Sequence, residues 1–412
     1  MEGQVRRRKV FYLPGYDPIP PRRYREIYRR EGAAQARISG YGLDLPAGRE
    51  GPGFGWRATG RFGEAVVEAD IEVLGWGDVV AASMGRSIPA TYLQLARTAA
   101  AYIGSGALWP MMRLRRGPVL TAFYPVAMLL GQLLAAILGA LLAGWTVARL
   151  VPGPAGVLLG AALGLGLGAG LLIAFRRLDG RLFVYYLMHD FAFTARSRGA
   201  YSPELEARLE CFVDRLAAEM EGDWDEVLLV GHSSGAYLAV SAAADLLRAR
   251  APAPGGPAFA LLTLGQVVPM ASFLPRAGRL RADLALLAGS DRLAWVDVSA
   301  PGDPCSFGLC DPVAVSGVAP EGQRNPLIVS AAFTRTLSPE KQAELKNRFF
   351  RLHFQYLHAF DRPGDYDYFA ITAGPLTLAE RFAGRPHSPG RITRAVSRHR
   401  SVERRAADRA TA

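Results

Sequence analysis

The chain contains little cysteine: its 412 residues include only Cys211, Cys305 and Cys310. Three unevenly spaced cysteines do not make a disulfide framework, so we expect a reducing compartment. Cys305 and Cys310 lack a zinc-site spacing with other ligands, and no histidine, cysteine or carboxylate cluster elsewhere has one. The sequence therefore predicts neither a metal nor an organic cofactor.

Acidic residues are also outnumbered, with 37 Asp and Glu against 48 Lys and Arg, which gives a formal charge of +11. The arginine excess lies at the two ends and beside the apolar segments, and no nucleic-acid motif accompanies it. This distribution favours an anionic membrane surface over nucleic acid as the partner. Residues 1–9 are basic but lack the apolar core of a signal peptide, so we expect the N-terminus to stay in the cytoplasm.

Two long runs contain no charged residue. Residues 119–147 form a run of 29 and residues 151–175 a run of 25, whereas about 20 residues suffice to cross a bilayer. A Pro-Gly-Pro turn at 152–154 separates them, so they predict a transmembrane hairpin. The alternative, a buried helical pair in a soluble core, is disfavoured because soluble helices are seldom apolar on every face.

Arginines cluster at the start and at the end of this hairpin, and these two ends lie on the same side of the membrane. The arginines are Arg113, Arg115 and Arg116 before the hairpin and Arg176, Arg177 and Arg181 after it, whereas the turn has only Arg149. The positive-inside rule then places both flanks in the cytoplasm. Gly160, Gly164 and Gly168 share one face of the second run, and such a ridge lets helices pack closely. It joins either the two runs or two copies of the chain, and intrachain packing is the simpler choice.

A short stretch at 225–240 combines three features that belong together. Residues 227–230 are an apolar run typical of a buried parallel strand, residues 231–235 read Gly-His-Ser-Ser-Gly, and residues 236–248 are typical of a helix. Strand, G-x-S-x-G and helix in this order form a nucleophile elbow, in which a strained turn exposes the serine above the sheet. Ser233 is the candidate nucleophile.

By this stretch the chain resembles the α/β-hydrolase family of serine hydrolases, lipases and esterases in particular. The resemblance implies an α/β fold with a doubly wound, mostly parallel sheet. It also implies an oxyanion hole built from an early loop and from the residue after the nucleophile. The strand-like residues 10–13 and the turn at 14–17 occupy the place of that early loop, with Pro where the family often has His. Gly15 or Tyr16 and Ser234 are the expected donors.

The family's order of serine, acid and histidine directs the search for the other two catalytic residues. The acid follows a late strand, here predicted at 293–299, and Asp303 fits that place; Asp297 and Asp311 are the alternatives. Its role would be to accept a hydrogen bond from the histidine and fix the tautomer.

Elimination narrows the base to two of six histidines. Those excluded precede the nucleophile or lie in the polar tail: His189, His232, His387 and His399. His353 and His358 remain. A last strand at 347–352 would end beside His353, and His-x-x-Tyr resembles a pattern of some lipases; a strand reaching 356 would favour His358. Strand boundaries decide between them, and on the shorter strand we favour His353 as the base, with His358 as the alternative.

Strand-like segments on both sides of the hairpin indicate that it is inserted into one hydrolase domain. We expect residues 1–112 and 181–384 to form that domain, residues 113–180 the hairpin, and residues 385–412 a basic, disordered tail. Strands are predicted at 10–13, 62–74, 181–188, 227–230, 259–264 and 293–299, and helices at 22–35, 92–107, 203–220, 236–248, 280–287 and 374–382.

The expected function is hydrolysis of carboxylic esters, of lipids or other apolar acyl groups, by a Ser-His-Asp mechanism without a cofactor. The expected setting is a bacterial inner membrane, with the catalytic domain in the cytoplasm. A noncatalytic membrane scaffold with the same fold, and acyl transfer to an acceptor other than water, are the alternatives. A homo-oligomer through the glycine-rich run is a further possibility.

Overall fold

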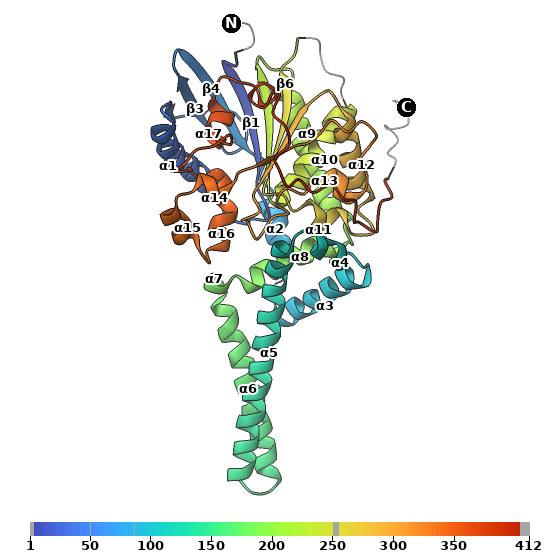
Figure 1. Ribbon diagram of the computed structural model, residues 1–412. Coiled ribbons are helices and arrows are strands. Elements are labelled where there is room, and N and C mark those ends of the chain that lie inside the picture. The colour runs from blue at the N-terminus through green and yellow to red at the C-terminus, as the bar shows by residue number, and fades with distance from the viewer. Residues whose placement is uncertain (1–3, 50, 86, 250–254, 404–412) are drawn as a thin grey trace.

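The computed structural model describes residues 4–49, 51–85, 87–249 and 255–403, and within them an eight-stranded sheet covered by helices on both faces (Figure 1). The strands are β1 (Arg7–Leu13), β2 (Gly42–Asp44), β3 (Gly55–Phe62), β4 (Ala65–Val73), β5 (Glu226–His232), β6 (Ala258–Leu264), β7 (Ala294–Ser299) and β8 (Leu327–Ser330). Their order in the sheet is β2-β3-β4-β1-β5-β6-β7-β8. The strands from β4 to β8 in this order run parallel, whereas β2, β3 and β4 pair antiparallel. The predicted α/β class with a mostly parallel sheet is confirmed.

Alternate residues of β1 enter two separate cores. Phe11 and Leu13 face one side and Val10 and Tyr12 the other, as the two-residue period of a strand requires. The first core is covered by α2 (Gly77–Ser83), α9 (Pro203–Glu219), α10 (Ser234–Ala249), α11 (Val268–Ser272), α12 (Gly278–Gly289) and α13 (Pro312–Ser316). The second is covered by α1 (Arg22–Ser39), α14 (Phe333–Thr336), α15 (Pro339–Leu345), the 3₁₀ helix η1 (Phe354–Leu357), α17 (Tyr368–Ala373) and α18 (Leu378–Arg381).

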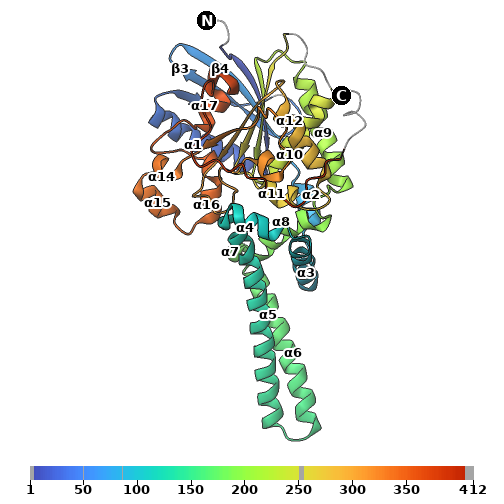
Figure 2. The ribbon, with the colours of Figure 1, turned by 45° about the vertical axis from the view of Figure 1, so that its right-hand side comes forward.

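A long helical hairpin projects from the sheet domain (Figures 1 and 2). It consists of α5 (Arg116–Leu150) and α6 (Pro154–Arg177), and both helices are long and apolar enough to span a membrane. Only 17% of the most apolar stretch of each is buried, which is unlike the core helix of a soluble protein. Gly160 and Gly164 pack directly against the backbone of Gly144 and Ala140 on α5. The glycine ridge therefore packs within the chain, which was the simpler of the two alternatives.

Four helices lie where the hairpin meets the sheet domain, and we call them the collar (Figure 2). They are α3 (Ile88–Gly104), α4 (Leu108–Leu114), α7 (Asp179–Leu182) and α8 (Val184–Arg196). β1 starts at the end of the sheet that lies away from the collar and runs toward the collar. The carboxyl ends of the parallel strands therefore face the hairpin (Figure 1). The hairpin and collar lie in the chain between β4 and β5, which both pair with β1. They are an insertion into a single sheet.

The strand predicted at 181–188 is wrong, because these residues form α7 and the start of α8. A short apolar run does not distinguish a strand from a buried helix. The buried residues Val184, Tyr185, Met188 and Ala192 have helical spacing and pack against Leu129 of α5. The neighbouring hairpin, rather than the sheet, buries this segment.

The C-terminal region differs from the prediction in three places. The strand expected at 347–352 is largely helical, forming α16 (Phe349–His353), and the last strand is β8. The helix expected at 374–382 is shorter, starting at a capping box between Thr377 and Glu380. α17 occupies part of the segment before it.

The tail is not disordered over residues 385–403. Its backbone donates from Ser388 to Ile328 and from Ile392 to Leu309, and Arg391 forms an ion pair with buried Asp311. These bonds attach the segment to the sheet domain although it has few apolar residues. The remainder of the predicted tail, 404–412, lies outside the described residues.

Candidate active site

Ser233 occupies the tight turn between β5 and α10. Its φ is +58°, a left-handed conformation that costs a residue with a side chain about 1–2 kcal/mol. The Ser233 N–H donates to the Leu264 carbonyl at 2.9 Å, and its own carbonyl accepts from Ala236 at 3.1 Å. The backbone bonds hold the strained turn and leave the side chain at the carboxyl edge of the sheet.

Glycines on both sides allow this turn to form. A Cβ on Gly231 would lie 2.6 Å from the Gly235 carbonyl oxygen, and one on Gly235 would lie 2.2 Å from the Leu13 carbonyl oxygen. Both contacts are too short for any side chain. The two glycines of the G-x-S-x-G sequence are therefore needed where strand, turn and helix approach most closely.

His353 and Asp303 form a buried pair. His353 Nδ1 lies 2.8 Å from Asp303 Oδ2, and both residues are less than a tenth exposed. Asp303 follows β7 and His353 is the last residue of α16. With Nδ1 engaged by the carboxylate, the ring presents Nε2 as its free nitrogen.

The Asp303 carboxyl is held in its ionised form. Burial raises its pKa, but the His353 ring and the Cys305 N–H outweigh burial, so its pKa lies below the ordinary value. The Tyr356 hydroxyl also donates to Oδ2 at 3.0 Å and accepts from the Ala300 N–H. An anion in this place stabilises an imidazolium on His353.

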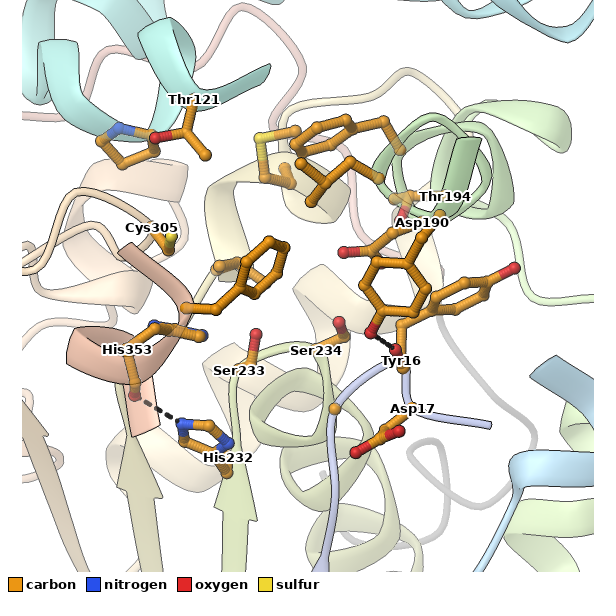
Figure 3. A pocket seen from close by; sticks show the side chains of 18 of the residues that line it. Tyr16, Asp17, Thr121, Asp190, Thr194, His232, Ser233, Ser234, Cys305 and His353 are labelled. Carbon is orange, nitrogen blue, oxygen red and sulfur yellow. Dashed lines mark hydrogen bonds between the residues drawn. The ribbon is translucent and has the colours of Figure 1, made fainter. Parts of the chain in front are cut away.

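Ser233 and His353 line the same cavity, which has a volume of about 80 Å³. Figure 3 shows the Ser233 hydroxyl pointing into it, with the His353 ring at its side. Side chains from α5, α8 and α11 close the cavity on the collar side, among them Thr121, Phe191 and Met270. The structure thus brings the predicted nucleophile, base and acid together from three distant parts of the chain.

The predicted oxyanion residues also lie at this cavity. Gly15 lies in the turn after β1 and next to Ser233. A Cβ at Gly15 would lie 3.0 Å from the Ser233 Cβ and 3.5 Å from its Oγ. Tyr16 and Ser234 both line the cavity. Ser234 is the first residue of α10, and the first N–H groups of a helix have no partner within the helix. The Ser234 N–H is therefore available to a negatively charged oxygen above Ser233.

The other histidines near the site serve different purposes. His358 Nδ1 contacts the Phe354 carbonyl at 2.7 Å, and His358 does not line the cavity. His232 is buried and packs against His353 with the rings tilted and their centroids 4.8 Å apart, and its Nε2 lies 3.1 Å from the His353 carbonyl oxygen. Burial lowers the pKa of His232 to about 3, so it stays neutral and supports His353.

The alternative acids are occupied elsewhere. Asp297 is buried inside β7 and accepts from Thr263 at 2.7 Å. Asp311 caps α13 and pairs with Arg391. The carboxylate that contacts His353 Nδ1 is that of Asp303, not that of either alternative.

Asp190 of α8 is a site residue that the sequence did not reveal. Its carboxyl group points into the cavity from the collar side (Figure 3). Burial raises its pKa to about 7, although the His353 ring and a hydrogen bond with Ser234 act in the opposite direction. A carboxyl group beside Ser234 changes the electrostatic potential at Ser233, where charge develops.

One group of donor atoms has the dimensions of a metal site. Asp303, Cys305 and His353 each place one such atom within 4.8 Å of the others. A cysteine binds a metal as its thiolate, but burial raises the pKa of the Cys305 thiol well above its usual value. The direct bond between Asp303 and His353 also occupies the atoms that would bind the ion. The donor set suits a hydrogen-bonded pair better than a metal.

Comparisons of the chain with protein-family models, with curated proteins and with solved structures found no match.

Proposed function

We propose that this chain is a serine hydrolase of the α/β-hydrolase type that cleaves carboxylic esters with apolar acyl groups and is anchored in a membrane by α5 and α6. One arrangement carries the proposal. Ser233 stands at positive φ in a cavity that His353 also lines, and His353 is paired with buried Asp303. A nucleophile that shares a cavity with a base, and a buried acid that orients the base, are the parts of a catalytic triad.

In the proposed reaction, His353 Nε2 accepts the hydroxyl proton while Ser233 Oγ attacks the ester carbonyl carbon. The carbonyl oxygen becomes negative and accepts hydrogen bonds from the backbone near Tyr16 and Ser234. Each such donor typically contributes about 10²–10³ in rate. The imidazolium then protonates the departing alcohol, and water attacks the acyl-enzyme through the same base.

The Cys305 thiol does not compete as the nucleophile. Its sulfur lies near His353, but burial keeps the thiol protonated at neutral pH, and only a thiolate is strongly nucleophilic. Ser233, by contrast, has the strained turn and the adjacent helix start that the reaction requires.

The direction of the sheet supports an apolar substrate at a membrane. The carboxyl ends of the strands, and with them Ser233, face the collar and hairpin (Figure 1). Arginines at the collar end of the hairpin favour the cytoplasmic side for the catalytic domain. A lipid ester in the cytoplasmic leaflet would lie on the same side of the membrane as the cavity.

An assay of purified full-length protein in lipid nanodiscs with an ester such as p-nitrophenyl butyrate tests the proposal. Wild type is expected to release both the alcohol and free acid, and Ser233→Ala to lose this activity. Ser234→Ala is the matched control, because it keeps the backbone N–H and is expected to remain active. Acid release that is unchanged in Ser233→Ala would overturn the proposal, as would the absence of hydrolysis in folded wild type. Transfer of the acyl group to an added alcohol, without free acid, would instead support acyl transfer.

A further inference from the structure

A second cavity lies inside the collar, next to the cavity that holds Ser233. It has a volume of about 120 Å³, and its lining includes Leu95, Ala99, Met111, Ala122 and Val126. The Tyr102 hydroxyl in its wall is already bonded to the Met270 carbonyl at 3.0 Å. The Thr98 hydroxyl also lies in the wall, buried and without a hydrogen-bond partner among the described residues, but one such group is fewer than a bound water needs. A water molecule needs only about 10–15 Å³ but also two to four polar partners. This cavity has room for several waters and little to hold them, so an apolar occupant suits it better.

The two cavities share walls. Phe191 of α8 and Met270 of α11 line both of them. The first turns of α5 also border both, with Pro118 and Thr121 on the Ser233 side and Val119 and Ala122 on the other side. An extended molecule with its reacting atom at Ser233 can continue into the apolar cavity once these side chains move.

The packing of the hairpin fixes the level of this cavity relative to a bilayer. Gly160 packs on Gly144 and Gly164 on Ala140. Each step of four residues toward the C-terminus of α6 therefore matches a step of four residues toward the N-terminus of α5. The same register places Arg176 level with Met128. A hydrogen bond of 2.9 Å from the Tyr124 hydroxyl to the Leu182 carbonyl agrees with this alignment.

Arg176 and Arg177 mark the edge of the hydrocarbon, since they follow the uncharged run of α6. Ala122 and Val126 lie two to six residues beyond Met128, which is about 3–9 Å along the helix. The headgroup layer is about 5–8 Å thick on each side. The apolar cavity therefore lies at the depth of the headgroups, immediately outside the hydrocarbon.

The outer wall of the cavity is apolar and open to the surroundings. Ile103 and Phe123 line the cavity and are 55% and 41% exposed. Leu93, Trp109 and Leu120 on α3, α4 and α5 are also at least half exposed. Exposed apolar side chains on neighbouring helices, with a Trp among them, are typical of a surface that contacts lipid.

We propose that the collar cavity binds the acyl chain of a membrane lipid ester, which enters sideways from the bilayer past Ile103 and Phe123 and places its carbonyl group at Ser233. The site holds the chain within α3, α4, α5 and α8, and it selects long acyl chains over short ones. This inference rests on the proposed hydrolase function for its catalytic half, whereas chain binding itself does not require catalysis.

The first test is a matched pair of alanines on α3. Ala99 lines the cavity and Ala100 is exposed beside it, so Ala99→Phe fills the cavity and Ala100→Phe leaves it open. Ala122→Phe fills it from α5, and exposed Ala127→Phe is its control. Contacts with a few methylene groups of a substrate change kcat/KM by about 10-fold or more relative to a substrate that lacks them. The filled variants are expected to lose at least about 10-fold on p-nitrophenyl palmitate while changing less than about 2-fold on the butyrate ester. Controls should keep both rates. Equal effects on the two esters in both filled variants would overturn the proposal.

The second test does not depend on turnover. A palmitic acid with a mid-chain diazirine is photolysed with wild type and Ser233→Ala in nanodiscs, and the labelled peptides are identified by mass spectrometry. Labelling of the Met111 or Met270 peptide in both proteins, lost in Ala99→Phe and kept in Ala100→Phe, supports the proposal. Labelling confined to the lipid-facing parts of α5 and α6 would overturn it. Because Ser233→Ala is included, loss of the hydrolase function alone would leave this result readable.

Discussion

His353 Nδ1 and Asp303 Oδ2 are 2.8 Å apart, although the two residues are separated by 50 positions in the chain and come from different elements. The pair is buried, and Tyr356 donates a second hydrogen bond to the same carboxylate oxygen.

Replacing the acid should slow the reaction without changing the fold. Asp303→Asn preserves the shape of the side chain and a hydrogen-bond acceptor for Tyr356, but it no longer stabilises an imidazolium or fixes the His353 tautomer. We expect kcat for ester hydrolysis to fall about 10³–10⁴-fold, with KM little changed. Steady-state kinetics and a thermal melt of the same sample measure both effects. A loss below about 10-fold would mean that Asp303 does not act as the orienting acid.

The two downstream histidines should differ sharply in their effect. His353→Gln is expected to reduce hydrolysis by at least about 10³-fold, because the base is lost. His358→Gln should retain more than half of the activity, since its ring lies outside the cavity and contacts Phe354. Hydrolysis rates of the two variants, measured side by side, test this prediction. A larger loss in His358→Gln than in His353→Gln would assign the base to His358.

His232 should act through His353. Its Nε2 donates to the His353 carbonyl, so His232→Phe removes a buried hydrogen bond, which costs about 0.5–1.5 kcal/mol. We expect a lower melting temperature and a reduced kcat, with partial recovery in His232→Gln, which can restore the donor. Equal kcat values for the Phe and Gln variants would show that this hydrogen bond is not what positions the base.

Asp190 predicts a dependence of stability on pH. Its pKa is raised to about 7 in the folded protein, whereas an unfolded aspartate titrates near 3.9, so the folded state binds more protons between these values. Its contribution to stability therefore falls as pH rises from about 4 to about 7 and stays low above that. Asp190→Asn removes this loss. The melting temperature of Asp190→Asn minus that of wild type should therefore be larger at pH 8 than at pH 4, which thermal melts measure. The same difference at both pH values would contradict the raised pKa.

The sequence predicted the parts of the site that depend on local pattern. The apolar run of β5, the glycines around Ser233 and the Ala-rich start of α10 are contiguous, so a single stretch specifies the turn. Asp303 was found because it follows a strand that was itself readable as an apolar run. The helix predicted at 203–220 is likewise observed as α9, where the Ser202 side chain accepts from the Leu205 N–H.

Other features depend on contacts that no local pattern contains. His353 was chosen on the basis of a strand, yet it ends a short helix and is oriented by Asp303 and His232. β8 has only four residues with mixed exposure, so its pairing with β7 gave no signal of its own. Asp190 reaches the cavity only because the collar packs over the sheet edge, in a segment expected to be a strand.

The central claim is that Ser233 is a nucleophile activated by His353, and its most direct test is covalent labelling by a fluorophosphonate probe. Full-length protein in nanodiscs is labelled and digested, and the modified peptide is identified by mass spectrometry. The account predicts one adduct, on Ser233, that is absent in Ser233→Ala, strongly slowed in His353→Gln and retained in Ser234→Ala. An adduct on Ser234 or Cys305, or no labelling of folded wild type, would contradict it.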